Sequence, residues 1–335
     1  MRFTLNQPQK RQTLLTNWLN DSTPFHCSQL TMVSGDASFR RYFRFIDQGK
    51  SYIAVDAPPA SEDSRAFASV AASYQQQGVP VPRIYAIDHK LGFYCLEDFG
   101  DRLFASALDP QGCHALYREA LSHLPKIQSC ISTEQGELPA FDEVLLSKEF
   151  ALFSHWLLEV HLKLTLDTAE QAMLEQTFSF LQKNFFAQPQ VGVHRDYHSR
   201  NLMLFSNDQI GIIDFQDAVV GPITYDAASL LRDCYQTWPA ALVYTWLKPW
   251  HGEHYSQYPW PVFKRWFDLT GMQRHIKASG IFARLCHRDG KRAYLHDIPN
   301  TLEYLLEVGS QYPECSEFVQ LIATKIKPAA EKACK

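Results

Sequence analysis

The amino-acid sequence predicts an α+β fold in two lobes, a small antiparallel sheet that carries one helix and a larger, mainly helical lobe. Three observations predict it. The first hundred residues contain several short strand-like runs, and the composition turns helical from Asp101 onward. Short apolar runs then interrupt the later helices. With 335 residues, of which 46% are hydrophobic, the chain can bury a sizeable core.

The first lobe reads as hairpin, helix, hairpin. Its strand runs are rich in aromatic and β-branched residues, and Pro58 and Pro59 break the chain before the helix. Gly78 follows the last residue of the helix. The predicted elements are strands at 39–46 and 51–56, a helix at 61–77, and strands at 83–87 and 93–96.

In the second lobe, apolar residues recur at helical spacing. Thr168, with Gln171 three residues further on, fits a capping box at the start of one helix. The predicted elements are helices at 110–130, 141–159, 168–186, 225–235, 261–287 and 299–311, and short strands at 191–194, 202–205 and 210–213.

Bulk properties argue against several classes of function. The formal net charge is -4 and neither half is strongly basic, so a nucleic-acid partner is not expected. No run approaches the roughly 20 apolar residues that cross a bilayer, and residues 1–20 lack the apolar run of a signal peptide. The eight cysteines form no CxxC pair. We expect a cytoplasmic protein with no membrane partner; a protein partner is not predictable.

One segment carries the residues that phosphoryl transfer requires. An H-R-D triplet ends at Asp196 and precedes Asn201 with the spacing H-R-D-x-x-x-x-N, and Asp214 follows thirteen residues later in a D-F pair. Asp196 is placed to accept the proton of an attacking hydroxyl. Asn201 and Asp214 offer the oxygen ligands that Mg²⁺ prefers. The spacing therefore predicts a protein-kinase-like fold that uses ATP and Mg²⁺.

The same residues also have purely structural interpretations. Asp196 could be a turn residue, Asn201 a strand-end cap and Asp214 part of an Asx-turn. Their joint spacing between apolar runs favours the catalytic interpretation. His194 and His198 could form a metal pair, but they lack an acidic partner in the right register, so zinc is not predicted.

The chain after Asp214 favours a small acceptor. A protein kinase carries a long activation segment that ends in A-P-E and docks a peptide. Here residues 216–222 lead almost at once into a helix near Tyr225. We therefore divide the chain into a nucleotide-binding lobe, 1–98, and a catalytic and substrate-binding lobe, 99–335.

The strings VHRDYHSRNLM and IIDFQDAVVGPITYDAASLLRD resemble the aminoglycoside phosphotransferase family, whose relatives include choline and homoserine kinases. Within that family, four further stretches resemble the bacterial anomeric kinases of amino sugars. They are SGDASFRRYFR at 34–44, VDAPP at 55–59, LEDFGD at 96–101 and QRHIKASGIFARLCHRDGK at 273–291. The resemblance, over about residues 10–325, implies ATP-dependent phosphorylation of the C1 hydroxyl of N-acetylmuramate or N-acetylglucosamine in peptidoglycan recycling.

The expected phosphate loop departs from the protein-kinase pattern. The G-x-G-x-x-G motif is missing, and Ser34, Gly35, Asp36 and Ser38 stand where it would fall. Their backbone N–H groups and hydroxyls could contact phosphate. The segment could equally be a hairpin turn without a ligand.

The third strand of a kinase normally carries a phosphate-binding lysine, and the run at 51–56 has none there. Arg40, Arg41 or Arg44 could supply the missing cation. For adenine, the backbone from Glu97 to Phe99 is the expected partner.

The acceptor site is predicted on the helix at 261–287. Arg274, Lys277, Arg284 and Arg288 fall within a narrow arc of that helix, with His287 beside them. This basic stripe could bind the lactyl carboxylate of N-acetylmuramate. It could equally be a solvated face, or supply ion-pair partners for acidic residues of loops and helices. A polycationic aminoglycoside would prefer an acidic pocket.

Two other functions stay open. Choline or an amino alcohol could be the acceptor, although a cationic acceptor calls for aromatic and acidic lining. The missing strand lysine would also suit a pseudokinase that acts as a binding module. Asp226, just inside a helix start, could steady that helix or reach substrate, and the structural role is favoured.

Overall fold

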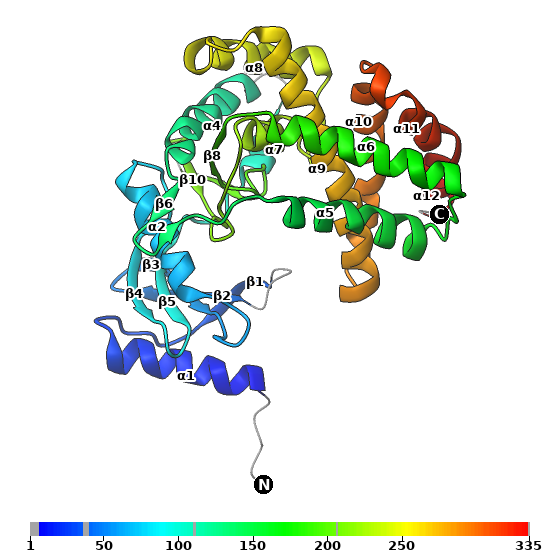
Figure 1. The fold of residues 1–335 in the computed structure, drawn as a ribbon. Coiled ribbons are helices and arrows are strands. Elements are labelled where there is room, and N and C mark those ends of the chain that lie inside the picture. The colour runs from blue at the N-terminus through cyan, green and yellow to red at the C-terminus, as the bar shows by residue number, and fades with distance from the viewer. Residues whose placement is uncertain (1–6, 36–39, 110–111, 206, 334–335) are drawn as a thin grey trace. The chain divides into compact units, whose positions relative to one another are not determined.

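The computed structural model describes residues 7–35, 40–109, 112–205 and 207–333. It divides into two compact units (Figure 1). Unit 1 consists of Met1–Arg102, Ser132–Gly136 and Met203–Gln216, and unit 2 of Leu103–Ile131, Glu137–Leu202 and Asp217–Lys335. No helix among the described residues combines the length and the apolar character needed to cross a membrane.

Unit 1 is built on a five-stranded antiparallel sheet with the order β1-β2-β3-β5-β4. The β2–β3 hairpin turns at Gln48 and Gly49, which both have positive φ. The predicted pairs of strands are confirmed with small shifts in their ends. The strands are β1 (Thr31–Gly35), β2 (Arg41–Asp47), β3 (Lys50–Asp56), β4 (Ile84–Asp88) and β5 (Phe93–Glu97).

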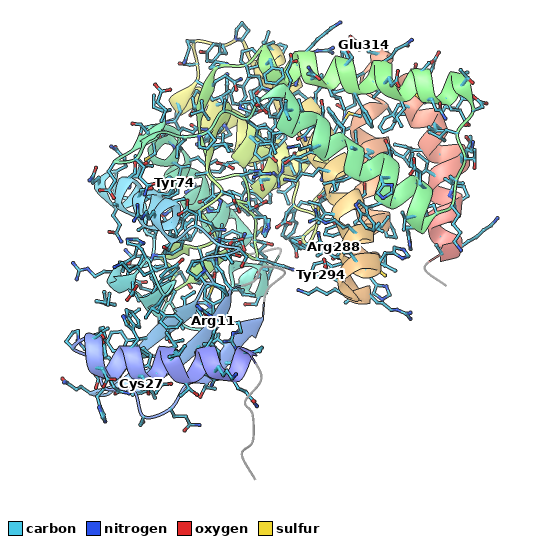
Figure 2. The ribbon with its side chains drawn as sticks, turned by 60° about the horizontal axis from the view of Figure 1, so that its bottom comes forward. Arg11, Cys27, Tyr74, Arg288, Tyr294 and Glu314 are labelled. Atoms are coloured by element: carbon cyan, nitrogen blue, oxygen red, sulfur yellow. The ribbon has the colours of Figure 1, made fainter. Side chains whose placement is uncertain are left out.

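One face of this sheet is covered by α1 (Gln7–Ser22), a helix that the sequence analysis did not predict. Leu15, Trp18 and Leu19 of α1 pack in one cluster with residues of β2, β3 and β5. At one edge of this contact Arg11, labelled in Figure 2, binds the buried Asp56 with 2.7 Å between Nε and Oδ1. This ion pair ties the helix to the end of β3.

The opposite face of the sheet is covered by α2 (Ser64–Gln76), which is capped by the side chain of Asp63. Phe67 of α2 stacks on Tyr94 of β5 with 5.2 Å between ring centroids. It also stacks on Phe215 at 5.0 Å. The segment after β10 is therefore anchored on the α2 face of the sheet.

Unit 2 is organised around α9 (Trp260–Asp289), a helix of 30 residues (Figure 1). It packs against α5 (Glu143–Leu152), α6 (Thr168–Phe186), α7 (Tyr225–Leu231) and α10 (Ile298–Gly309). These predicted helices are confirmed, although the capping box of α6 is formed by Asp167 and Glu170, one residue earlier than predicted.

A glycine sets the spacing between α9 and the chain after α5. A Cβ added at Gly280 would lie only 2.3 Å from the backbone carbonyl carbon of Leu152, so no larger residue fits without a shift. A π-helical segment, Phe153–His161, begins at this contact. The α9 backbone can therefore approach closely the point where α5 changes its winding.

The remaining elements are further helices and three two-stranded pairs. The helices of this group that the sequence analysis did not predict are α3 (Phe104–Ala107), α8 (Ala240–His254), α11 (Ser316–Leu321) and α12 (Lys327–Ala333). α4 (Cys113–Gln128) was predicted to begin earlier. The two-stranded pairs are β6 (Ser132–Thr133) with β7 (Gly136–Glu137), β8 (Gln190–Val193) with β11 (Val219–Pro222), and β9 (Leu202–Leu204) with β10 (Ile210–Ile212).

Candidate active site

The loop that carries Asp196 follows β8 directly and is fixed by a buried carboxylate from α7. The Asp226 oxygens accept the backbone N–H groups of His194 at 2.7 Å and Arg195 at 3.0 Å. Arg195 has a φ of 80°, a left-handed conformation that is costly for a residue with a side chain. The two hydrogen bonds hold the chain in this turn and thereby fix the backbone position of the next residue, Asp196.

The loop also binds to itself. The Asp196 carbonyl accepts the N–H of His198 at 3.0 Å and the Asn201 side-chain amide at 3.0 Å. The His198 carbonyl in turn accepts the backbone N–H of Asn201 at 2.9 Å. Ser199 is anchored separately, because its N–H donates to Asp233 at 2.9 Å. Asp196 and Asn201 therefore belong to one hydrogen-bonded turn.

The Asp196 carboxylate is accessible and surrounded by cations. Its side chain keeps 35% of its surface exposed, and Nζ of Lys277 lies 4.0 Å from Oδ1. Burial raises the pKa of Asp196, but its electrostatic interactions with Lys277, His198, Arg274 and Arg195 lower it to about 2. The group is therefore a carboxylate at neutral pH, as a proton acceptor must be.

These cations are balanced by a second, buried carboxylate. Glu149 of α5 is 3% exposed and accepts Gln273 at 2.9 Å and Arg195 at 3.2 Å. It also lies 3.5 Å from Nζ of Lys277, which donates to the Tyr225 hydroxyl at 3.1 Å. Burial lowers the pKa of Lys277, but Glu149, Tyr225 and Asp196 raise it above its usual value, so the ammonium stays charged.

Asp226 is the residue whose role the sequence did not disclose. Its carboxylate reaches the loop before Asp196 rather than the amides of its own helix. Burial raises its pKa to about 7, against the two N–H donors and Arg274, which lower it. The contact joins residues more than 30 positions apart, and the only local signal was an acidic residue in an otherwise apolar first turn.

The basic stripe of α9 is divided between two environments. Lys277 and Arg274, whose Nη1 donates to the Arg195 carbonyl at 3.0 Å, lie at the Asp196 loop. Arg284 follows Lys277 by two turns, about 10 Å along the helix axis.

At the far end of α9, Nε2 of His287 lies 3.0 Å from Nδ1 of His161. Arg288, labelled in Figure 2 near the end of the helix, forms an ion pair with Asp289 at 2.8 Å. Arg284 is half-buried, and its Nε has no hydrogen-bond partner within the described ranges. Of the predicted basic stripe, Arg274 and Lys277 are therefore brought to the Asp196 loop, whereas the contacts described for Arg284, His287 and Arg288 lie elsewhere.

In unit 1, Asp214 is held in a constrained conformation. Its φ is 64°, in the left-handed region. The next residue, Phe215, is buried against Phe67 and Tyr74 of α2 and fixes the backbone. The Gln216 amide donates to Oδ1 of Asp214 at 2.9 Å.

The Asp214 side chain remains 30% exposed. An accessible carboxylate on a constrained backbone is a hard-oxygen donor of the kind that Mg²⁺ prefers. Strained backbone at such a residue is typical of functional sites.

The predicted nucleotide residues also lie in unit 1. Ser34 and Gly35 belong to β1, where they pair with Tyr42 and Arg41, whereas Asp36 and Ser38 lie outside the described residues. Arg40 is 8% exposed and binds Glu62.

The segment expected to bind adenine is held by a backbone hydrogen bond and a ring contact. Glu97 ends β5, and its N–H donates to the Arg83 carbonyl at 2.9 Å. The Phe99 ring packs edge-on against Phe205 at 4.8 Å. A Cβ at Gly211 would lie 2.5 Å from the same ring, so this glycine makes room for it.

Fold and site define a phosphotransferase with a kinase-like fold. Choline kinase LicA from Streptococcus pneumoniae superimposes with a TM-score of 0.63 at 11% identity, covering 89% of this chain and 99% of that one. An ethanolamine kinase from Plasmodium vivax gives 0.61 at 12% identity, with 90% and 96% covered. At such identities the likeness concerns the fold alone.

The family model of the phosphotransferase enzyme family (APH) matches residues 29–260, and the chain belongs to this family. A relative from Pseudomonas aeruginosa is 41% identical over 302 residues, which cover 89% of this chain and 88% of the relative. One from Neisseria meningitidis is 38% identical over 323 residues, covering 93% and 95%. Both carry the name N-acetylmuramate/N-acetylglucosamine kinase.

Proposed function

We propose that this protein is an ATP-dependent kinase that phosphorylates the anomeric C1 hydroxyl of N-acetylmuramate, N-acetylglucosamine or both. The observation that carries the proposal is the 38–41% identity, over about nine tenths of the chain, to relatives that bear the name of this activity. The product would be a sugar 1-phosphate, a precursor of nucleotide sugars in the recycling of peptidoglycan. The reaction would take place in the cytoplasm.

In this proposal Asp196 orients the sugar hydroxyl and accepts its proton. The hydroxyl oxygen forms a bond to the γ-phosphorus of ATP, the bond from that phosphorus to the β,γ-bridging oxygen breaks, and ADP leaves. The cations around Asp196 keep the carboxylate ionised before transfer. Removing such a base typically costs a factor of about 10² to 10⁴ in rate.

Asn201 and Asp214 would hold Mg²⁺ through their side-chain oxygens. The bound ion would neutralise charge on the β- and γ-phosphates. The turn that links Asn201 to the Asp196 carbonyl orients the amide, and the buried Phe215 fixes the backbone of Asp214. Both residues are thus oriented by bonds within their own units.

The proposal is tested by ³¹P NMR of reactions with ATP, Mg²⁺ and one acceptor each: N-acetylmuramate, N-acetylglucosamine, choline or kanamycin. We expect a sugar 1-phosphate signal with the amino sugars. It should fall at least 100-fold in Asp196→Asn and persist in Asp21→Asn, which removes an exposed carboxylate on α1. Transfer to choline or kanamycin instead, or to none of the four, would overturn the proposal.

A further inference from the structure

On the α2 face of the sheet, β3 has no lysine of the kind that a protein kinase uses to bind phosphate. The register pairs Tyr42 of β2 with Val55 of β3, and Val55 with Tyr94 of β5, so the three side chains form one row. Phe67 of α2 stacks on Tyr94 in this row, which identifies the face. Side chains alternate along β3, so Ile53 shares the face with Val55, and β3 supplies it with no cation.

Arg40, just before β2, brings a guanidinium to this face. Its Nε and Nη2 lie 2.8 Å and 2.7 Å from Oε2 of Glu62, which precedes α2. Both side chains of this pair are only 9% exposed. The third nitrogen, Nη1, lies 3.9 Å from Oδ1 of Asp214, the proposed metal ligand. One edge of the guanidinium is thus fixed by the Glu62 carboxylate, and Nη1 lies toward the Asp214 carboxylate; Tyr42 also interacts with the Arg40 side chain.

The two other arginines of this stretch serve different partners. Arg41 binds the buried Asp56 with 3.0 Å between Nε and Oδ2, on the face that α1 covers. Arg44 binds Asp98 through both Nε and Nη2 and also lies 2.8 Å from Asp101. Their guanidinium groups hold α1 and the segment after β5, respectively.

We propose that Arg40 is the cation that binds the nucleotide phosphates and that Glu62 holds it in position. This pair would replace the ion pair between a strand lysine and a helix glutamate that protein kinases use. An arginine suits the exchange, because its planar fork can bind a carboxylate on one edge and a phosphate oxygen on the other. The proposal rests on the use of ATP in the proposed function and concerns only nucleotide binding.

Calorimetric titration of the full chain with Mg²⁺–ADP and with adenosine, in the absence of sugar, tests this role. We expect Arg40→Met to weaken ADP binding at least tenfold and to leave adenosine binding within twofold of wild type. Arg40→Lys should recover part of the loss, since it restores a point charge without the fork. Arg65→Met removes an exposed arginine from α2 and should leave both affinities unchanged.

A purely structural ion pair predicts a different pattern. Arg40→Met would then lower the thermal midpoint while the ratio of ADP to adenosine affinity stayed at the wild-type value, and that result would overturn the proposal. Should Arg40→Met fail to fold, Glu62→Gln and Arg40→Lys carry the same comparison. Because no sugar is present, the titration can succeed or fail independently of the test with the amino sugars.

Discussion

The ammonium group of Lys277 lies 4.0 Å from Oδ1 of Asp196 and connects the proposed base to two buried groups, Glu149 of α5 and the Tyr225 hydroxyl of α7. The same ammonium lies 3.5 Å from Glu149, so its positive charge partly neutralises the negative charges of both carboxylates. The helical spacing of the basic stripe predicted that Lys277 contacts the substrate, and its place in the structure suggests that it also controls the charge of the base. The two roles lead to different kinetics.

We expect Lys277→Met to lower kcat for both amino sugars by about tenfold to 100-fold, because Asp196 loses its nearest cation and its alignment. The pKa of Asp196, about 2 in the wild type, should rise in the variant. Protonation would then reduce the rate as pH falls toward 5, whereas the wild type shows no such decline from this group. Steady-state kinetics between pH 5 and 8 measure both effects.

A role confined to the substrate carboxylate would instead raise KM for N-acetylmuramate alone. Lys264→Met serves as a control, since Lys264 lies on the same helix and pairs with Asp268 rather than Asp196.

Arg284 is the residue of the α9 stripe best suited to bind the lactyl carboxylate, because it is half-buried and its Nε is without a hydrogen-bond partner in the described ranges. We expect Arg284→Met to raise KM for N-acetylmuramate about tenfold, the loss of one charge-assisted contact, and to leave N-acetylglucosamine unaffected. Arg265→Met is the matched control: Arg265 lies on the same helix, where it pairs with Glu314 at 2.8 Å. An equal change for both sugars would contradict the assignment.

Asp226→Asn tests the positioning of the catalytic loop. An amide has one accepting oxygen, so it cannot bind the N–H groups of both His194 and Arg195 in the way the carboxylate does. We expect kcat to fall more than tenfold while the KM for ATP changes little.

The same variant should alter the dependence of stability on pH. Burial raises the pKa of Asp226 to about 7, so the folded state holds a proton that the unfolded chain releases near pH 4. The contribution of this group to the free energy of unfolding is therefore complete below pH 4 and declines as pH rises toward 7. Thermal midpoints of wild type and Asp226→Asn, measured from pH 5 to 8, should differ by an amount that changes with pH. A difference that is constant across this range would contradict the raised pKa.

Gly280→Ala should destabilise unit 2, because the new Cβ would lie 2.3 Å from the backbone of Leu152. Overpacking of this kind costs about 2 to 3 kcal/mol. In α8, Gly252 is exposed and has open space around its Cβ position, so Gly252→Ala should stabilise by about 0.5 to 1 kcal/mol. Urea unfolding of both variants measures the contrast, and a neutral Gly280→Ala would refute the close contact.

Much of the fold follows from local patterns. The span of α6 is predicted to the residue, and the β2–β3 hairpin follows from two strand-like runs around a turn. The helix α1 was missed because it is polar overall, although Leu15, Trp18 and Leu19 recur at helical spacing and could have disclosed it. Its stability comes from the sheet it covers, which a local pattern does not contain.

In the candidate site, too, local sequence patterns predict some residues, whereas others depend on contacts between distant parts of the chain. Asp196 and Asn201 are recognisable because the loop that binds them together is a short stretch of sequence. The hydrogen bonds from the loop to Asp226, and the ion pair between Arg40 and Glu62, join residues that are 22 or more positions apart. Helical periodicity placed Lys277 and Arg284 on one face of α9, but only tertiary packing decides which loop each meets.

The turn that joins Asn201 to the Asp196 carbonyl has a consequence for enzyme engineering. A substitution of Asn201 removes the hydrogen bond to the Asp196 carbonyl and disturbs the backbone that carries the proposed base, so the proposed metal ligand cannot be changed without affecting the base. A design for a new acceptor should therefore keep the sequence of this loop unchanged. Diversity would be better introduced toward the C-terminal end of α9, where Arg284 and Arg288 are not bonded to the loop in any contact that the structure describes.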